Sequence, residues 1–469
     1  MSGGGISRGM DPNTKSAGKL APLSNPAEIR IYQDNLPDRS GLSFENMAIF
    51  ERQQQSAEAA ALQNADQSGG DNLQQYRVTP KTPQSKHFVS ESSSQSREQE
   101  SAKIAELFGQ FDLNHDGFID KKEIIKADKT PGKVDGADPH AFATFLSERY
   151  KSLMGSSNDE WGFENNGVSL KDIHKYIDNV RDFSSKVTDR KGDTDYTLTL
   201  QGRQRDVTVH VPPSYDGSHP MPMVVMLHGF MQDKDDIARV SEFKQKADKE
   251  GFIAVFPNAT GWLGDHLRWW NVGKNQLYRS DDVDFIRQLT EVIPEKVNVD
   301  SDRVYLVGFS NGAMMAQEAA ARLNDRIAAV ASVSGGMLNK QDKPKGDMNA
   351  LLIHGGLDEI IPASGGMLVS LVGAPRVLSA LKAFEVWADA NGIKPTLWKN
   401  SSEPIQTYSA VDTSSGREVT FYNLKAGNHD WPGGPDSTTP AGEFKATDAV
   451  WNFLSRHSRK QLIARTREA

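Results

Sequence analysis

The fold is decided by the stretch VYLVGFSNGAMM, which occupies residues 304–315. Its first four residues form a continuous apolar run typical of a buried strand, and helical apolar spacing begins at Ala313. Between strand and helix stands Ser310, with Gly308 two residues before it and Gly312 two residues after it. A strand-to-helix turn this tight needs small residues at both places, and it lifts the serine hydroxyl clear of the sheet. The stretch therefore predicts a nucleophilic serine on an elbow between a strand and a helix.

Strands and helices are expected to alternate on both sides of this elbow. Continuous apolar runs, typical of buried parallel strands, occur at 223–227, 252–256, 304–308, 328–333 and 350–354. An alternating run typical of a half-buried edge strand covers 206–211, and a last strand is expected at 418–422. Helical spacing covers 237–249, 282–295, 313–323, 377–391 and 447–456. The pattern predicts an α/β-hydrolase fold over 193–457, with a mostly parallel sheet covered on both faces.

A serine hydroxyl is a poor nucleophile until a base removes its proton, so a histidine has to lie beside Ser310. Chain order in this fold runs serine, acid, histidine, which among the eleven histidines favours His429, in the loop after the last expected strand. The acid should follow a strand between these two residues, where it orients the imidazole. Asp358 fits best, shortly after the strand 350–354, and Glu359 is the near alternative.

Two backbone N–H groups aimed at one point are needed to bind the oxyanion of a tetrahedral intermediate. Asn311, directly after the nucleophile, supplies one of them. The loop after the strand 223–227 should supply the other, from Phe230 or Met231. His228, in the same loop, is expected to shape the loop and not to move protons.

Aromatic residues stand in the loops expected at the catalytic face, namely Trp262, Trp269, Trp270 and Trp431. They either contact substrate or pack beneath a long loop, and the candidate substrate-binding residues are Trp269, Trp270 and Trp431. Three acidic residues of these loops receive structural interpretations. Asp281 and Asp282 are expected to cap the helix that follows them, and Asp430 is expected to lie on the surface.

A second motif precedes the catalytic domain, in the run DLNHDGFIDKKE at 112–123. Oxygen side chains stand at positions 1, 3, 5, 9 and 12 and glycine stands at position 6, which is the pattern of a calcium-binding EF-hand loop. The predicted calcium ligands are Asp112, Asn114, Asp116, Phe118 through its carbonyl, Asp120 directly or through water, and Glu123 in bidentate form. The bound Ca²⁺ is expected to be structural or regulatory and not catalytic.

Four short helices are expected around this motif, at 104–111, 121–126, 141–154 and 170–180. A second loop at 159–172 has the closing pattern without the regular spacing, so it is interpreted as an empty structural mate. Ile119 and Val168 would face one another across a short strand pair. The region 99–183 therefore resembles the EF-hand family as a pair with a degenerate second hand. A polar linker at 184–192 is expected to join it to the catalytic domain.

The remaining segments and the composition limit the partners. Residues 1–98 are rich in Ser, Gly, Gln, Asn and Pro and are expected to be disordered, with helical character at 46–62 suited to folding against a partner. The formal net charge is −8 and the local exception is a basic tail at 458–469, so no nucleic-acid partner is expected. The absence of cysteine excludes disulfides and a cysteine nucleophile. With no transmembrane run and no cleavable signal peptide visible, the protein is expected to be cytoplasmic or secreted by a leaderless route.

Five blocks occur in a fixed order in the second half of the chain: MVVMLHGF, RWWN with SDDVDFI, GFSNGAMM, HGGLDEIIP and GNHDWPGG. Together they make residues 195–457 similar to polyhydroxybutyrate depolymerase-like esterases and feruloyl esterases. The resemblance implies Ser310, Asp358 and His429 as the catalytic triad. It also implies an oxyanion hole in the neighbourhoods of Phe230 and Asn311. Secreted members of this family often carry disulfides, which this chain lacks.

The sequence therefore predicts a calcium-binding serine esterase that acts through an acyl-enzyme. Its substrate would be a small or polymeric ester, either a polyhydroxyalkanoate-type polyester or a feruloyl or acetyl ester of a polysaccharide. Two other interpretations stay open: a serine peptidase on the same fold, and a calcium-dependent adhesion or scaffold protein with an inactive hydrolase domain. The presence of Ser310, Asp358 and His429 argues against the inactive scaffold, because a hydrolase domain that has lost its activity has usually lost one of these three residues.

Overall fold

The computed structural model describes residues 97–154, 156, 167–262, 267–273, 280–367, 376–394, 404–440, 442 and 444–460. The N-terminal segment expected to be disordered, with the helix expected at 46–62, lies outside the described residues up to position 96. So do most of the second loop expected at 159–172 and the basic tail beyond position 460.

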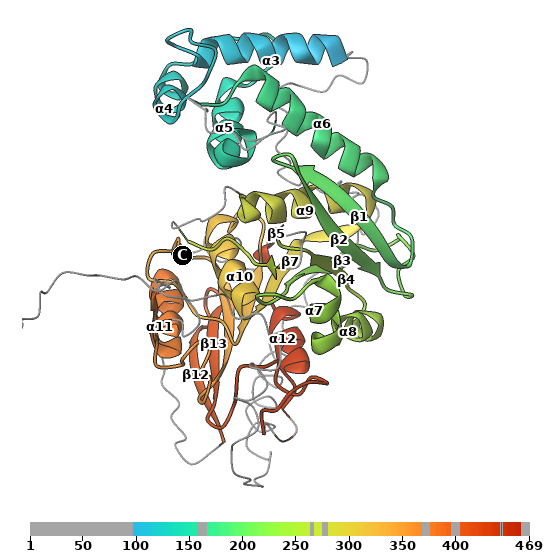
Figure 1. Cartoon of the computed structure of the whole chain (residues 1–469), viewed down its shortest axis with the longest axis vertical. Helices are drawn as coiled ribbons and strands as arrows, with labels where there is room; N and C mark the ends of the chain where they lie inside the picture. Colours follow the sequence, from blue (N-terminus) through green and yellow to red (C-terminus); the bar gives the residue numbers. More distant parts are fainter. Residues whose placement is uncertain are drawn as a thin grey trace, which may run out of the picture. The chain divides into compact units, whose positions relative to one another are not determined.

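The described part begins with four helices, all of them predicted (Figure 1). They are α3 (Arg97–Phe111), α4 (Lys121–Lys129), α5 (Pro139–Met154) and α6 (Leu170–Lys186). The predicted pairing of Ile119 with Val168 is present, since each donates its N–H to the carbonyl of the other, at 2.9 and 3.0 Å. We call α3–α6 and their connections the helical region.

The domain predicted to be catalytic, called the catalytic domain below, is built on a mixed, mostly parallel sheet of an α/β-hydrolase-like fold. Its strand order within the described residues is β1-β2-β4-β3-β7-β8-β9-β13-β12. The strands are β1 (Gly192–Leu200), β2 (Arg203–Val211), β3 (Met221–Leu227), β4 (Ile253–Pro257), β7 (Val299–Phe309), β8 (Ala329–Val333), β9 (Asn349–Gly355), β12 (Ile405–Asp412) and β13 (Arg417–Leu424). Two short pairs stand outside it, β5 (Gly261–Trp262) with β6 (Leu267–Arg268) and β10 (Gly366–Met367) with β11 (Arg376–Val377).

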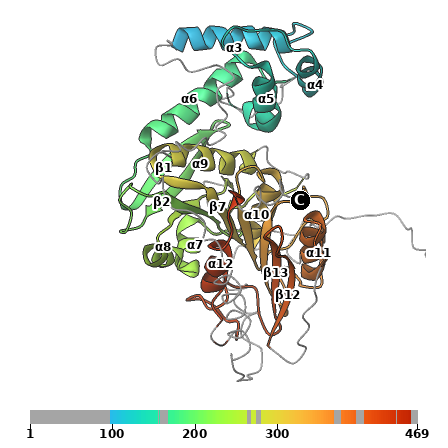
Figure 2. The same cartoon turned by 180° about the vertical axis from the view of Figure 1, so that it is seen from behind.

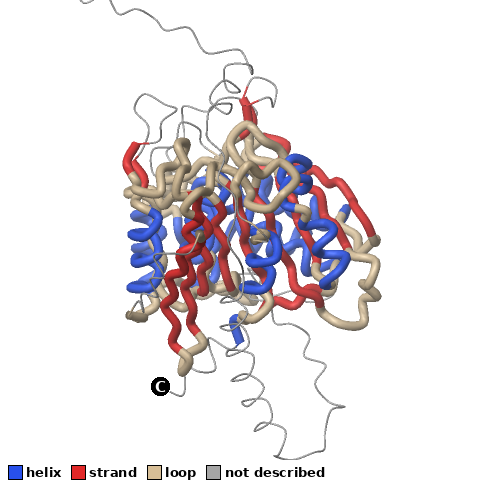
Figure 3. The backbone as a smooth tube through the Cα atoms, turned by 90° about the horizontal axis from the view of Figure 1, so that it is seen from below, coloured by secondary structure: helices blue, strands red, loops and turns tan. Residues whose placement is uncertain are grey.

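Helices cover both faces of this sheet, as predicted (Figure 3). They are α7 (Lys234–Ser241), α8 (Phe243–Glu250), α9 (Asp282–Lys296), α10 (Asn311–Arg322), α11 (Ala380–Ala390) and α12 (Ala446–Leu454). Alternate residues of β3 point to opposite faces: Val225 and Leu227 join the cluster that contains α9, α10 and α11, whereas Val224 and Met226 join the cluster of α7, α8 and α12. Among the described helices, none is long and apolar enough to cross a membrane.

Three details differ from the expectations. The run 206–211 is part of β2, which is second from the edge, because β1 was not predicted; β12, at the other edge, was also not predicted. The helix expected at 237–249 is broken into α7 and α8 at Glu242, whose φ of 53° is left-handed. The linker expected at 184–192 is shorter than predicted, since α6 continues through Lys186 and β1 begins at Gly192, and Val187 between them is buried.

The helical region is docked on the catalytic domain through α5, α6 and α9 (Figure 2). The Arg149 guanidinium of α5 pairs with Glu291 of α9 at 2.7 Å, and its side chain is only 2% exposed. The Tyr176 hydroxyl of α6 donates to the buried carboxylate of Asp284, at 3.1 Å. Apolar residues of the helical region and of the catalytic domain belong to one continuous cluster. The helical region and the catalytic domain therefore share one hydrophobic core and are not joined only by a flexible linker.

Candidate active site

The turn at Ser310 has the geometry that its sequence demands. Ser310 lies between the end of β7 and the first residue of α10, with φ 54° and ψ −120°, a conformation that costs energy for a non-glycine residue. A Cβ on Gly308 would lie 2.2 Å from the carbonyl oxygen of Gly312, and a Cβ on Gly312 would lie 2.3 Å from that of Leu227. Only glycine fits at both places, so the elbow is held between two backbone contacts.

Ser310, His429 and Asp358 form a continuous hydrogen-bonded chain, although they come from three separate loops. His429 Nε2 lies 2.8 Å from Ser310 Oγ, and His429 Nδ1 lies 2.8 Å from Asp358 Oδ2. Ser310 follows β7, Asp358 follows β9, and His429 follows β13, all at the carboxyl ends of parallel strands. With Nδ1–H donating to the carboxylate, Nε2 is left to accept the proton of the serine hydroxyl.

The carboxylate of Asp358 is fixed by its own loop. Its second oxygen, Oδ1, accepts the N–H groups of Ile360 and Ile361 at 2.9 and 2.8 Å, and the side chain is buried. Glu359, the alternative acid, is exposed, and no described hydrogen bond joins it to His429. The choice between the two carboxylates therefore falls on Asp358.

The loop that carries His429 is organised by its neighbour, Asp430. One carboxylate oxygen of Asp430 accepts the N–H groups of Thr438 and Thr439, at 2.6 and 2.8 Å. Its carbonyl accepts the hydroxyl of Ser334 at 2.8 Å. The interpretation of Asp430 as a mere surface residue is thus incomplete, because its side chain closes the loop around the histidine.

Two backbone amides beside the serine are available for an oxyanion. Asn311 begins α10, so its N–H has no helical acceptor. Met231 is removed from consideration, because its N–H donates to the carbonyl of Arg268 at 2.9 Å. The N–H of Phe230 has no acceptor in the described part of the chain, and a Cβ on Gly229, just before it, would lie 3.3 Å from Ser310 Cβ. The predicted pair, Phe230 and Asn311, is thus the pair with free amides.

His228 shapes this loop, as expected. It is fully buried, its Nδ1 bonds the carbonyl of Gly229 at 2.7 Å, and its Nε2 accepts the N–H of Ala259 at 3.0 Å. Burial lowers the pKa of His228 to about 4, so its ring stays neutral at neutral pH. Its carbonyl accepts the indole N–H of Trp270 at 2.9 Å.

Two of the three predicted substrate-binding tryptophans do not face the site. Trp270 is 1% exposed and Trp431 is 3% exposed, and the indole N–H of Trp431 donates to Thr447 Oγ1 at 2.9 Å. Both are core residues, and their assignment as substrate contacts is wrong. Trp269 is half-buried and packs against the exposed ring of Phe230, with centroids 6.1 Å apart, so it stays a candidate. The side chain of Trp262 lies outside the described residues.

Contacts that the sequence did not point to hold the loop over α10. The side-chain amide of Asn311 pairs with the backbone of Trp270: Oδ1 accepts its N–H at 2.6 Å, and Nδ2 donates to its carbonyl at 3.2 Å. The N–H of Gly273 donates to Glu318 Oε2 at 2.6 Å, where burial raises the pKa of Glu318 to about 7. These contacts join segments distant in sequence, so no local signal could reveal them.

The two aspartates before α9 have different roles. Asp281 is the N-cap, as predicted, because its side chain accepts the N–H of Asp284 at 3.2 Å. Asp282 is not a cap. Its carboxylate pairs with the buried Arg205 at 2.8 Å and accepts the N–H of Asn271 at 2.7 Å.

The loop 112–123 lies between α3 and α4, and its oxygen side chains accept backbone N–H groups. Asp112 accepts those of Asp116 and Gly117, at 3.1 and 3.0 Å. Glu123 accepts those of Leu113 and Asp120, at 3.0 and 2.8 Å. Asp116 accepts the N–H of Phe118, and Asp120 accepts those of Lys122 and Glu123. The side-chain oxygen of Asn114 accepts the N–H of Asp116. Among the described residues, no three His, Asp or Glu side chains converge closely enough to hold a metal ion.

Known proteins resemble the part of the chain that carries the serine elbow. Residues 207–351 match the family model described as Esterase PHB depolymerase. The putative esterase NocK from Nocardia uniformis subsp. tsuyamanensis is 27% identical over 286 residues, which are 55% of this chain and 81% of that protein. Feruloyl esterase B from Piromyces equi is 30% identical over 198 residues, 40% of this chain and 36% of that protein. The chain is a carboxylic-ester hydrolase.

The family match of this esterase includes Ser310 and the two candidate oxyanion amides, while Asp358 and His429 lie beyond its end. Among solved structures, acetyl xylan esterase from Aspergillus awamori aligns with 54% of this esterase and 94% of its own chain, with 16% identity and a TM-score of 0.37. The helical region of the esterase precedes the matched residues.

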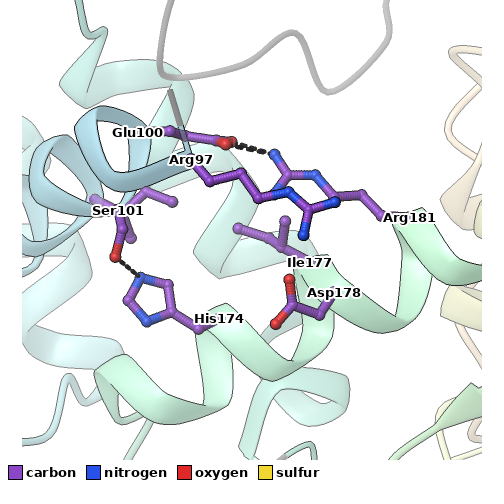
Figure 4. Close-up of a pocket in the computed structure, with 8 residues that line it drawn as sticks. Arg97, Glu100, Ser101, His174, Ile177, Asp178 and Arg181 are labelled. Carbon is purple, nitrogen blue, oxygen red and sulfur yellow. Dashed lines mark hydrogen bonds and ion pairs between the residues drawn. The ribbon is translucent and has the colours of Figure 1, made fainter. Parts of the chain in front are cut away.

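A separate pocket of the esterase lies between α3 and α6 (Figure 4). Two pairs of its polar side chains contact one another: Arg181 donates to Glu100, and Ser101 Oγ lies 3.2 Å from His174 Nε2. The elements that carry the triad do not line it. The pocket is therefore separate from the chemistry at Ser310.

Proposed function

We propose that the protein hydrolyses carboxylic esters through an acyl-enzyme formed on Ser310. The observation that carries the proposal is the hydrogen-bonded chain from Asp358 through His429 to Ser310, with both links at 2.8 Å. Three loops from three strands converge to make it, and the serine is held in a strained turn. Such a constellation matches the roles of nucleophile, base and orienting acid.

In the first step, Ser310 Oγ attacks the ester carbonyl carbon while His429 Nε2 takes the hydroxyl proton. The negative charge that develops on the carbonyl oxygen is accepted by the N–H groups of Phe230 and Asn311. His429 then gives its proton to the leaving alcohol, and the acyl group stays on Ser310. A water molecule, activated by His429 in the same way, releases the acid and restores the hydroxyl.

We assign the substrates to esters with an apolar or aromatic acyl group, in polyhydroxyalkanoate-type polyesters or in feruloyl or acetyl esters of polysaccharides. Among the described residues, four large apolar side chains are exposed on loops at the carboxyl ends of β3 and β9, at Phe230, Met231, Leu357 and Ile360. Trp269 packs against the first of them. Relatives named as feruloyl and putative esterases support the same class.

The two alternative functions receive less support. A peptidase on the same fold could use the same three residues, but the two relatives described above are named as esterases. An inactive scaffold is disfavoured by the intact contacts of Ser310, His429 and Asp358.

A substrate panel tests the proposal. Purified protein is assayed with p-nitrophenyl esters of increasing acyl length, methyl ferulate, hydroxybutyrate oligomers and peptide amides, with Ser310→Ala as the blank. We expect ester turnover that requires Ser310. Faster turnover of the amides than of every ester would replace the esterase by a peptidase, and no turnover of any of them would favour the scaffold.

We further propose that the loop 112–123 binds one Ca²⁺ in an EF-hand pair with the segment at Val168. Its side chains supply oxygen ligands in the order that an EF-hand loop requires. Gly117, at the sixth position, has a φ of +86°, a left-handed conformation that favours glycine and that the sharp turn of such a loop needs. The backbone pairing of Ile119 with Val168 joins the two halves of the region.

The side chains of the loop can hold Ca²⁺ if they exchange their backbone N–H partners for the ion. Asp112, Asn114, Asp116 and Glu123 would turn from backbone N–H groups to the metal, with the carbonyl of Phe118 as a further ligand. Asp120 caps α4 by accepting the N–H groups of Lys122 and Glu123, so we assign it a role through water. Bound Ca²⁺ would neutralise this acidic loop; it supplies no step of ester hydrolysis.

Thermal melting of the full chain in Ca²⁺ and in chelator tests this site without recourse to activity. A ligand present at a hundred times its dissociation constant stabilises the folded state by about 2.7 kcal/mol, so the midpoint should rise in Ca²⁺. Glu123→Gln, which removes one charge from the bidentate ligand, should abolish most of the rise, while Mg²⁺ should reproduce little of it. An unchanged midpoint of the wild type would mean that the loop binds no calcium.

A further inference from the structure

The hairpin turn between β1 and β2 contains a residue that the turn itself does not favour. Gln201 and Gly202 are its two central residues, and both have a positive φ, 52° and 69°. A two-residue turn of this kind prefers Asn, Asp or Gly at both places. Glutamine in the left-handed region is strained, because its Cβ approaches the following carbonyl oxygen. The side chain of Gln201 therefore needs a compensating role.

Its amide bridges the helical region and the catalytic domain. Gln201 Nε2 donates to the carbonyl of Lys151, near the end of α5, at 2.8 Å. Gln201 Oε1 accepts the N–H of Asp281, the N-cap of α9, at 3.0 Å. One side chain thus holds the end of one helix against the beginning of another.

From the beginning of α9, a series of hydrogen bonds leads to the residue after the nucleophile. Asp282 accepts the N–H of Asn271 at 2.7 Å, and Asn271 Nδ2 donates back to the carbonyl of Ser280 at 3.0 Å. The next residue toward the N-terminus, Trp270, is held on both backbone groups by the side chain of Asn311. Asn311 is directly bonded to Ser310 and carries one of the two amides assigned to the oxyanion.

We propose that Gln201 is a positioning residue for ester hydrolysis. It fixes the N-terminus of α9 against α5, and α9 in turn holds the segment 270–271 that clamps Asn311. Gln201 touches neither substrate nor the triad, and it acts on the transition state through the placement of the Asn311 amide. The inference rests on the proposed acyl-enzyme mechanism, and it makes the helical region a part of the catalytic unit.

The decisive variant is Gln201→Asn. Asparagine suits the left-handed turn better than glutamine does, but its amide is one methylene shorter and cannot reach both Lys151 and Asp281. We expect kcat for p-nitrophenyl acetate to fall about tenfold with KM within twofold, because the lost interaction acts only in the transition state. The melting midpoint should stay equal or rise. A role confined to the turn predicts the opposite, an unchanged kcat.

Ser184→Ala is the matched control. Ser184 Oγ donates to Glu295 at 2.7 Å, and this bond also joins the helical region to α9, but at the far end of the helix. Its loss should leave kcat unchanged within twofold. An equal fall in kcat for Ser184→Ala would mean that any loosening of the interface matters and would overturn the specific role of Gln201.

A double-mutant cycle tests the route to the serine. Asn311→Ala removes the clamp on Trp270 but keeps the backbone N–H of residue 311. If Gln201 acts through this clamp, Gln201→Asn should have little further effect on kcat in the Asn311→Ala background. Additive losses would overturn the route.

Hydrogen exchange keeps the inference testable even if the wild type hydrolyses none of the esters. Amides of 267–273 should exchange at least several-fold faster in Gln201→Asn than in the wild type and in Ser184→Ala. Equal exchange in all three proteins would overturn the positioning role. Absence of ester turnover with the expected change in exchange would reject the proposed function alone.

Discussion

The triad and the loop 112–123 are both built around carboxylates, but these carboxylates face different partners. Asp358 bonds His429, which bonds Ser310, so the chain of contacts is complete within the folded protein. In the loop, Asp112 and Glu123 bond backbone N–H groups. The first region is organised by the chain alone, whereas the second is held in a shape that a cation would have to rearrange. Changes to the two regions should therefore differ in size and kind.

The largest effect is expected at the triad. Ser310→Ala removes the nucleophile, so kcat should fall by at least about 10³-fold. Because the serine side chain contributes little to the core, the melting midpoint should stay unchanged. Steady-state assays with p-nitrophenyl acetate, after removal of contaminating esterases, give the ratio. Residual turnover above about one per cent of wild type would remove Ser310 from its role.

The second largest effect is expected at the junction between the helical region and the catalytic domain. Arg149→Met leaves Glu291 with one partner fewer inside the interface, and breaking a buried pair of this kind costs about 3–5 kcal/mol. Chemical denaturation measures the loss in the free energy of unfolding. Lys186→Ala is the control, since its pair with Asp182 is exposed and worth less than about 0.5 kcal/mol. Equal costs for the two variants would contradict the buried junction.

The third effect depends on pH and concerns Glu318, which lies beneath the loop that carries Trp270. Burial raises the pKa of Glu318 from 4.5 to about 7, so the folded protein holds a proton that the unfolded chain has lost. Its contribution to stability is full below pH 4.5 and disappears as the pH rises through 7.

Glu318→Gln removes this dependence and keeps an oxygen for the N–H of Gly273. The free energy of unfolding of the variant, relative to wild type, should be higher at pH 8 than at pH 4.5 by up to about 3 kcal/mol. Denaturant titrations at the two pH values test this. A difference that does not change with pH would show that folding does not raise the pKa of Glu318.

The smallest effects distinguish two glycines of the helical region. A Cβ meets nothing within 4 Å at either Gly117 or Gly109, so only backbone conformation matters. Gly117→Ala should destabilise the protein by about 1 kcal/mol, because φ is +86°. Gly109→Ala, inside α3, should stabilise it by about 0.5–1 kcal/mol. Midpoints that shift in the same direction would mean that the loop backbone does not hold this turn in solution.

The elements that sequence predicted are those with a strong local signal. The buried strands β3, β7 and β9 are continuous apolar runs, and a run of this kind suits few other structures. The edge strand β1 was missed because its residues are mostly polar and only partly buried. The break at Glu242 was missed because nothing in its residue type marks a left-handed conformation.

In the candidate site, too, the residues that were predicted are those with a strong signal in the sequence. Ser310 stands in a motif whose spacing carries steric meaning, and chain order then selects Asp358 and His429 as its partners. Trp270 and Trp431 were misassigned because residue type shows that a ring is large but not which way it faces. Gln201 could not be found at all, since its two partners lie in other elements of the fold.

The buried pair between Arg149 and Glu291 has a consequence for the order in which the protein is made. The two residues are 142 positions apart, and Arg149 leaves the ribosome first. At about 5–20 residues per second, roughly 7 to 30 seconds pass before its partner is synthesised. During this interval the guanidinium has to stay in water, so α5 cannot take its final place while the N-terminal half is nascent. Docking of the helical region is therefore one of the late events of biosynthesis, although its helices are made early.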